Sequence, residues 1–473
     1  MPTASLSCPA WAQAIAQPAQ EFSLTPLPVV GRLPEGLRGT LYRNGPGRLE
    51  RGGERVGHWF DGDGAVLAVH FADQGASAVY RYVQTAGYQQ EAAAESFLFP
   101  NYGMTAPGPF WNNWFRKVKN AANTSVLALP DKLLALWEGG NPHSLDLHTL
   151  ETWGTENLEK LEEGEPFSAH PKVAPDTGEI FNFGIVAGPQ ASLKLYKSNS
   201  SGQIIKTSSV QLEGLPLVHD FILAGPYLVF CIPPVRVNLL SAAVGLSSFS
   251  DAMEWKPQLG THILVIDRDL NLVSRAEADP WYQWHFANGY RDADELVIEV
   301  ARFPNFQTNQ NVKEVATGTI QTPARATLWQ MRLAPQTGAV KEAAEVLDRS
   351  CEFPVVPQHQ TGQPWRYSYL SMHRDEADVG QELFGAIARY DRSSGALSVA
   401  DMGKNCYPSE PIFVPAAPHS EQGWVLTVVY DGDTDTSEVR VYESDRLEDD
   451  PLCRLELPSV IPHSFHGTWK HQR

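Results

Sequence analysis

Four histidines lie in apolar segments that are far apart along the chain. His466 follows an aromatic residue near the C-terminus, and His170, His219 and His285 occupy similarly apolar surroundings upstream. Only a closed, radially arranged fold could bring four such distant segments to one point. A single histidine in an apolar strand is usually an ordinary core residue, but four of them favour a shared role. We interpret them as candidate ligands of a buried metal ion, because imidazole nitrogen binds iron, zinc, copper and nickel.

Three glutamates also lie among apolar neighbours, and they are Glu138, Glu352 and Glu410. An unpaired carboxylate is costly to bury in such surroundings. Histidines that bind a metal need their second ring nitrogen held, usually by a carboxylate or a carbonyl group. We therefore expect these glutamates to be partners of the histidines, although a lone glutamate before a proline, as at Glu410, is more often a turn residue.

Most of the chain alternates apolar and polar residues over short segments, which is the pattern of β-strands. The expected strands are 40–43, 66–71, 79–83, 133–137, 228–232, 262–267, 296–301, 328–333, 367–372, 385–390, 425–430 and 439–442. Turn residues mark outer hairpins at 145–152, 174–179, 333–338 and 390–395. Hairpins that recur at intervals of roughly 40 to 70 residues favour a β-propeller. The alternative is a β-sandwich pair or an irregular all-β protein.

Helical periodicity is expected in only three places, at residues 11–17, 111–122 and 239–249. No linker rich in proline, glycine or serine divides the chain. We expect residues 1–30 to be a mobile or partly helical lead-in and residues 31–473 to form a single domain.

Charge and cysteine usage exclude several classes of function. The formal net charge of −18 argues against nucleic acid as a partner, because phosphates require a basic surface. The five cysteines are scattered and form no C-x-x-C motif, so neither a zinc ribbon nor a disulfide framework is expected. No secretory signal and no apolar run of about 18 residues are present. We therefore expect a protein of a reducing compartment, the cytoplasm, with no transmembrane segment.

One segment nevertheless suits a membrane surface. Phe110, Trp111, Trp114 and Phe115 stand beside three cationic residues in the run 109–119. Aromatic side chains next to cations are typical of a helix that lies in the interface of a bilayer. We expect peripheral contact with membranes through this segment, and the alternative is a helix packed on top of the propeller.

Several runs resemble the carotenoid cleavage oxygenases, a family of non-haem iron enzymes, and most resemble the cyanobacterial apocarotenoid 15,15′-oxygenases within it. They occur in the family's order over nearly the whole chain. The runs are 39–47, 59–64, 123–124, 135–140, 168–171, 219–221, 351–354, 385–387 and 465–467.

The resemblance implies a seven-bladed β-propeller with a cap of helices and loops over an axis that bears Fe(II). It implies that His170, His219, His285 and His466 are the iron ligands, and that Glu138, Glu352 and Glu410 hold the last three of them in that order. Thr124 matches a residue whose methyl group crowds one of the remaining coordination positions, which leaves one position open for dioxygen, the co-substrate.

The reaction that the resemblance implies is cleavage of the central 15,15′ double bond of an apocarotenoid, an apolar polyene, to give retinal-type aldehydes. No residue need act as a nucleophile. The same iron chemistry on another carotenoid bond or on a stilbene is the first alternative. A propeller that binds apolar ligands without catalysis is the second alternative, and the presence of all four histidines and all three glutamates argues against it.

Overall fold

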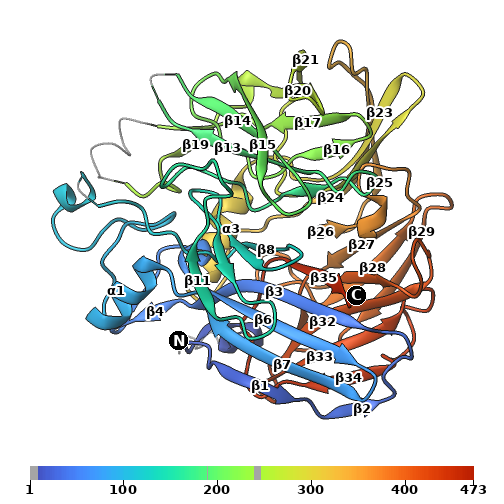
Figure 1. The fold of residues 1–473 in the computed structure, drawn as a ribbon. Helices are drawn as coiled ribbons and strands as arrows, with labels where there is room; N and C mark the ends of the chain where they lie inside the picture. Colours follow the sequence, from blue (N-terminus) through green and yellow to red (C-terminus); the bar gives the residue numbers. More distant parts are fainter. Residues whose placement is uncertain (1–8, 115, 189, 239–246, 473) are drawn as a thin grey trace, which may run out of the picture.

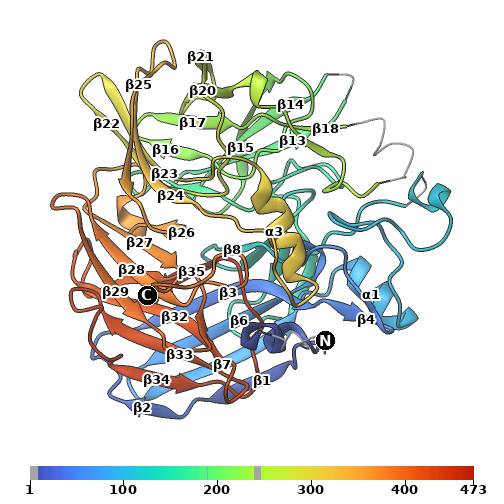
Figure 2. The same cartoon turned by 180° about the vertical axis from the view of Figure 1, so that it is seen from behind.

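The computed structural model describes residues 9–114, 116–188, 190–238 and 247–472, which form an all-β, propeller-like structure. Successive sheets follow one another around a common centre in the order of the sequence, from blue through green and orange to red (Figures 1 and 2). The last strand, β35 (Gly467–His471), pairs antiparallel with β3 (Gly39–Arg48). The two ends of the chain therefore meet in the first sheet and close the ring.

Six sheets in the described ranges contain four or more strands. The first three are, in order of pairing, β1 (Phe22–Pro26), β7 (Gly75–Tyr82), β6 (Asp63–Ala72), β3 and β35; β11 (Thr152–Thr155), β10 (His143–Leu145), β9 (Leu133–Leu136) and β8 (Ser125–Ala128); and β12 (Lys172–Val173), β13 (Ile180–Val186), β14 (Ser192–Ser198) and β15 (Ile204–Gln211).

The fourth sheet has eight strands and the last two have four and six. They are β21 (Leu272–Ala278), β20 (Thr261–Asp267), β17 (Tyr227–Ile232), β16 (Ile222–Ala224), β22 (Phe286–Asp292), β23 (Glu295–Arg302), β24 (Thr327–Leu333) and β25 (Val340–Leu347); β26 (Cys351–Val355), β27 (Tyr367–Met372), β28 (Ala386–Asp391) and β29 (Ala396–Asp401); and β2 (Val29–Gly31), β34 (Cys453–Glu456), β33 (Thr436–Glu443), β32 (Gly423–Asp431) and β30 (Cys406–Pro408), with β31 (Ile412–Pro415) also on β32. Two short ribbons complete the β-structure, β4 (Glu50–Arg51) with β5 (Glu54–Arg55) and β18 (Val235–Val237) with β19 (Met253–Trp255).

The eight-stranded sheet differs from the seven separate blades expected from the sequence. It consists of two four-stranded meanders joined by one parallel pairing, Ala224 with Gly289, between β16 and β22. Gly289 permits this close approach, because a Cβ atom there would lie 2.6 Å from the Cγ2 atom of Ile222. The described strands therefore form six large sheets in place of seven.

The apolar core lies between neighbouring sheets because side chains alternate along each strand. On β6, Leu67 and Val69 pack in the cluster shared with the last sheet, whereas Val66 and Ala68 pack in the cluster shared with the second sheet. Inner strands such as β9 are buried along their whole length, and outer strands such as β21 are largely accessible. This pattern makes the short alternating segments recognisable as strands, and each of the twelve expected segments overlaps one.

The expected hairpins are also present, joining β10 to β11, β12 to β13, β24 to β25 and β28 to β29. Three of them are outer hairpins, as expected. The hairpin of β12 and β13 is an inner one, since β12 lines the centre of the ring beside His170.

Helices were predicted less well than strands. The expected N-terminal helix is the 3₁₀ helix η1 (Ala10–Ile15), and the expected helix at 111–122 is only the short η3 (Phe110–Trp114). The latter prediction was wrong, because the described residues 116–121 form no helical turn and Ala122 has a left-handed backbone with φ of 46°. The third expected helix, 239–249, falls mostly outside the described residues.

Two α-helices were missed, α1 (Ala86–Ala94) and α3 (Gln307–Val315), because neither carries a wide apolar stripe. The remaining 3₁₀ helices are η2 (Trp59–Asp61), η4 (Pro257–Leu259) and η5 (Gln358–Gln360). Among the residues described, none of the helices combines the length and apolar character needed to cross a bilayer. Four cysteines, Cys231, Cys351, Cys406 and Cys453, are buried and unbridged.

The described part of the lead-in is tied to the propeller. Trp11 is fully buried and its Nε1 atom donates to the carbonyl of Gln381 at 3.0 Å. Strands β1 and β2 pair with β7 and β34, in two different sheets. The residues from 9 to 31 thus add to the first and last sheets next to the point of ring closure.

Because β35 closes the ring, we expect Trp469 to contribute strongly to the stability of the fold. Its side chain is buried against Phe71 in the cluster between the first and last sheets. Trp469→Ala should lower the free energy of unfolding by about 3–5 kcal/mol, the usual cost of truncating a buried aromatic side chain. Denaturant titration measures this change. Trp153→Ala, at a site 55% exposed, is the matched control, and an equal effect of both variants would contradict the assignment.

Candidate metal centre

The four histidines converge at the centre of the ring. Each lies just before the inner strand of its own segment: His170 before β12, His219 before β16, His285 before β22 and His466 before β35. One ring nitrogen from each lies within 4.8 Å of the others, and all four side chains are buried. Equivalent positions in different parts of a ring point to the same axis, so the fold brings together residues that are up to about three hundred positions apart.

The distances between the imidazole nitrogens suit a shared cation. The Nε2 atoms of His170 and His219 are 3.0 Å apart, and those of His219 and His285 are 3.2 Å apart. Two nitrogens bound to a metal at about 2.1 Å and at right angles would lie about 3.0 Å apart. The spacing therefore matches adjacent coordination positions around one ion.

The tautomers of the histidines strengthen this fit. Carboxylates face the Nδ1 atoms of His219, His285 and His466, so these nitrogens carry the protons. When these imidazoles are neutral, their Nε2 atoms present lone pairs to one another. Lone pairs in close opposition repel unless a cation lies between them, so this donor set is suited to a metal ion and poorly explained as a set of core hydrogen bonds.

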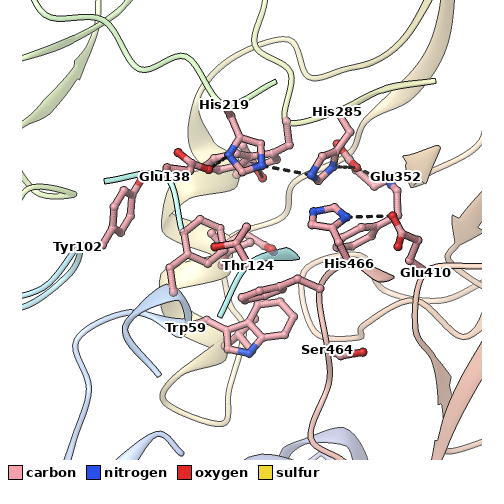
Figure 3. A pocket seen from close by; sticks show the side chains of 18 of the residues that line it. Trp59, Tyr102, Thr124, Glu138, His219, His285, Glu352, Glu410, Ser464 and His466 are labelled. Carbon is pink, nitrogen blue, oxygen red and sulfur yellow. Dashed lines mark hydrogen bonds and ion pairs between the residues drawn. The ribbon is translucent and has the colours of Figure 1, made fainter. Parts of the chain in front are cut away.

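Each of the three glutamates faces one histidine (Figure 3). Glu138 contacts Nδ1 of His219, Glu352 accepts from Nδ1 of His285 at 2.6 Å, and Glu410 accepts from Nδ1 of His466 at 2.9 Å. Glu352 and Glu410 are buried, whereas the side chain of Glu138 is 32% exposed. The sequence placed all three among apolar neighbours, but Glu138 borders a cavity and is the most accessible of them.

Arg43, which the sequence did not single out, is a fully buried cation beside Glu410. Its Nη1 atom donates to the Glu410 carboxylate at 3.1 Å and to the Glu410 main-chain carbonyl at 3.0 Å. Its Nη2 atom donates to the carbonyl of Phe465 at 2.8 Å, next to His466. The guanidinium group therefore fixes both the carboxylate and the chain that carries the last histidine.

Burial and these carboxylates act in opposite directions on the histidine pKa values. For His170, burial and then the neighbouring imidazoles hold the pKa well below its usual value. Burial lowers the pKa of His466 to about 4, although Glu410 opposes it. Burial also disfavours the charged form of His285, but Glu352 outweighs it and raises that pKa. His170 and His466 are therefore neutral near pH 7, which is the form that binds metals.

Asp220 is a second residue that the sequence did not identify. It is buried next to His219, and its carboxylate accepts from the main-chain nitrogens of Phe221 at 2.8 Å and Phe286 at 3.0 Å. It also pairs with Lys172 at 2.8 Å. One carboxylate thus connects the segments of His170, His219 and His285, and only the tertiary structure could reveal it.

A large apolar cavity of about 660 Å³, lined in part by residues of η2 and α3, reaches the histidines. Its wall includes Trp59, Phe60, Phe303, Val312 and Leu383. Polar atoms form the smaller part of its wall, and those of the three glutamates and of His219, His285 and His466 are among them (Figure 3). The cavity is of the size that proteins use to bind small organic ligands.

Thr124 lines this cavity close to the histidines (Figure 3). Its hydroxyl group donates to Oδ1 of Asn123 at 3.1 Å, and its carbonyl accepts from the main-chain nitrogen of His466 at 3.3 Å. The backbone contact sets the position of Thr124 relative to the last histidine.

The aromatic segment lies at the surface. Phe110, Trp111 and Trp114 are exposed, the two tryptophans by 50% and 53%, and their rings contact one another. Phe115 lies outside the described residues. Val118, a few residues further on, is exposed and also lines the large cavity, so the chain that follows the aromatic patch reaches the cavity mouth.

Comparison with known proteins identifies the family. The family model described as retinal pigment epithelial membrane protein matches residues 15–471. The chain belongs to this family. It is the carotenoid cleavage oxygenase family that the sequence motifs indicated, and that prediction is confirmed.

The relatives match over nearly their whole length. Apocarotenoid-15,15′-oxygenase of Synechocystis sp. is 29% identical over 97% of this chain and 96% of its own. Resveratrol cleavage oxygenase 1 of Aspergillus fumigatus is 26% identical over 95% of this chain and 93% of its own. The crystal structure of the cobalt-substituted Synechocystis apocarotenoid oxygenase superposes with a TM-score of 0.90 at 28% identity, and covers 98% of both chains.

The pairing of Glu352 with His285 predicts a measurable effect on metal affinity. Glu352→Gln should weaken metal binding by about 10–100-fold, because a neutral amide holds the imidazole less strongly and lowers its basicity. Competition with a chelator measures the affinity. Glu342→Gln, at an exposed position of β25, is the control and should leave the affinity unchanged. Equal affinities of both variants would contradict the pairing.

Proposed function

We propose that this protein is a non-haem iron(II) dioxygenase that cleaves the 15,15′ double bond of an apocarotenoid to give retinal-type aldehydes. The observation that carries the proposal is the set of four buried imidazoles, one ring nitrogen of each within 4.8 Å of the others, beside a large apolar cavity. Iron is supported by the all-nitrogen donor set and by membership of the family. The crystal structure of a cobalt-substituted relative supports a transition-metal site in this fold.

The residues of this chain would divide the work as follows. His170, His219, His285 and His466 would hold the ion, and Glu138, Glu352 and Glu410 would orient the last three of them and offset the positive charge. When bound, iron(II) would supply the means of activating dioxygen, whose two atoms end in the two carbonyl products.

The cavity would align the polyene and exclude water. Its aromatic and aliphatic wall suits a conjugated chain that cannot form hydrogen bonds. We propose that Thr124 limits access to one side of the metal, since its hydroxyl is bonded to Asn123 and its methyl group is left to face the imidazoles. The proposed reaction needs no nucleophilic side chain, because the cofactor would carry the chemistry.

We propose further that the ring has seven blades in a single domain of residues 31–473, with a lead-in of residues 1–30. The eight-stranded sheet supports this count, because the strand pairing between its two described meanders is limited to Ala224 with Gly289. Counted separately, they would each provide one blade between the third sheet and the sheet of β26 to β29.

A substrate assay tests the proposed reaction. Purified protein supplied with iron(II), oxygen and a C30 apocarotenal should yield an aldehyde of retinal length. A stilbene is the second substrate to test, because the Aspergillus relative is named for resveratrol cleavage. Cleavage of the stilbene alone, or of the polyene at another bond, would overturn the 15,15′ assignment. Liquid chromatography with mass detection distinguishes the products.

Loss of a proposed ligand tests the metal centre independently of substrate. His219→Ala should abolish both iron content and turnover, because the buried site would lose one of four donors. Iron analysis of the purified variant and the cleavage assay give the two readouts. His148→Ala, at an exposed turn, is the control and should retain both. Full iron occupancy in His219→Ala would contradict the assignment.

We also propose that the protein is cytoplasmic and takes its substrate from a membrane surface. Phe110, Trp111 and Trp114 form an exposed aromatic patch next to Arg116 and Lys117, which suits the interface of a bilayer. Val118 links this patch to the cavity. An insoluble polyene could then pass from lipid to the cavity without crossing water.

Flotation with liposomes tests the membrane contact. Trp111→Glu combined with Trp114→Glu should markedly reduce the bound fraction, because charged side chains in the patch oppose insertion into the apolar interface. Trp153→Glu changes a tryptophan that is equally exposed on β11 and serves as the control. Unchanged flotation of the double variant would rule out this segment as the contact.

A further inference from the structure

A second, smaller pocket of about 170 Å³ reaches the histidines from the centre of the ring. His170, His285 and His466 line it, whereas His170 does not border the large cavity. Conversely, His219 borders only the large cavity. The four imidazoles therefore form a partition between two spaces, which we call the large cavity and the axial pocket.

The course of the chain explains the partition. Before each of the first three histidines the chain lines the large cavity, at Ser168, Val218 and Trp284. After each of them it lines the axial pocket, at Lys172, Leu223 and Asn288. The chain passes from one space to the other at the histidines, so the axial pocket lies on the far side of the partition from the large cavity.

The two spaces differ in chemistry. The large cavity is walled mainly by aromatic and aliphatic side chains, so a hydrated divalent ion would have to cross a largely apolar space before it reached Glu138 and the histidines. The axial pocket contains the Lys172–Asp220 ion pair, and Thr361 and Asn288 stand in its wall. Lys172, Val356 and Thr361 are only partly buried, so the axial pocket meets solvent at these residues.

We infer that the axial pocket is the route by which the metal ion enters and leaves the four-histidine site, while the large cavity serves the polyene. This inference rests on the proposed metal centre. Lys172 acts as the gate of the route. Its ammonium group pairs with the carboxylate of Asp220. The side chain of Lys172 is 20% exposed, so it can move into solvent when an arriving cation replaces it at that carboxylate.

The experiment measures the rate of metal transfer and needs no substrate. Co²⁺ uptake by metal-free protein, and its release to a fluorescent chelator, are followed by stopped flow. Thr361→Trp narrows the axial pocket and should slow uptake and release several-fold by similar factors, leaving equilibrium occupancy unchanged. Val186→Trp places the same side chain in the large cavity and should leave both rates unchanged.

A second variant tests the gate without adding bulk. Lys172→Gln removes the cation that competes for Asp220 and should speed Co²⁺ uptake, since an unpaired carboxylate attracts cations. Wild-type rates in both Thr361→Trp and Lys172→Gln would overturn the route, and so would slowing by Val186→Trp alone. A wild-type protein that binds no Co²⁺ at equilibrium would overturn the metal centre itself. Occupancy and rate therefore separate the failure of the proposed function from the failure of the route.

Discussion

The opposition of imidazole lone pairs at the centre of the ring is the constraint on which the site depends. With protons held on Nδ1 by Glu138, Glu352 and Glu410, the Nε2 atoms face one another at close range. Without a cation this arrangement is repulsive, so the scaffold must hold it by other means. It does so through strands on all sides, because each histidine directly precedes or closely precedes an inner strand whose pairing is fixed.

Buried charges complete that support. Arg43 joins β3 to Glu410 and to the segment of His466, and Asp220 joins the segments of the other three histidines. The buried carboxylates of Glu410 and Asp220 are tolerated because each of them has charged or hydrogen-bonding partners. The same groups that orient the imidazoles thus also connect neighbouring parts of the ring, so stability and metal binding are expected to share residues.

The sequence predicted the strands and the convergence of the histidines well, but not the helices or the outer supports. Strands such as β20 and β27 were recognisable from the sequence because their apolar residues alternate with polar ones or follow one another over a short run. Their burial in the structure matches that pattern. The expected helix at 111–122 is represented only by η3, and Ala122 at its expected end adopts a left-handed conformation that local periodicity does not encode. Arg43 and Asp220 carried no signal of their own, because their partners are distant in sequence.

The sequence by itself determined the chemistry that is available: four histidines and three glutamates in apolar segments, an all-β pattern, and a cluster of exposed aromatic residues. These properties are local, since they depend on residue type and on the spacing of near neighbours. The tertiary structure alone decided that the histidines divide two spaces, that Glu138 is partly accessible, and that two meanders join at Gly289. Those features depend on distances between segments that are remote in the chain, and such distances are set only when the ring closes.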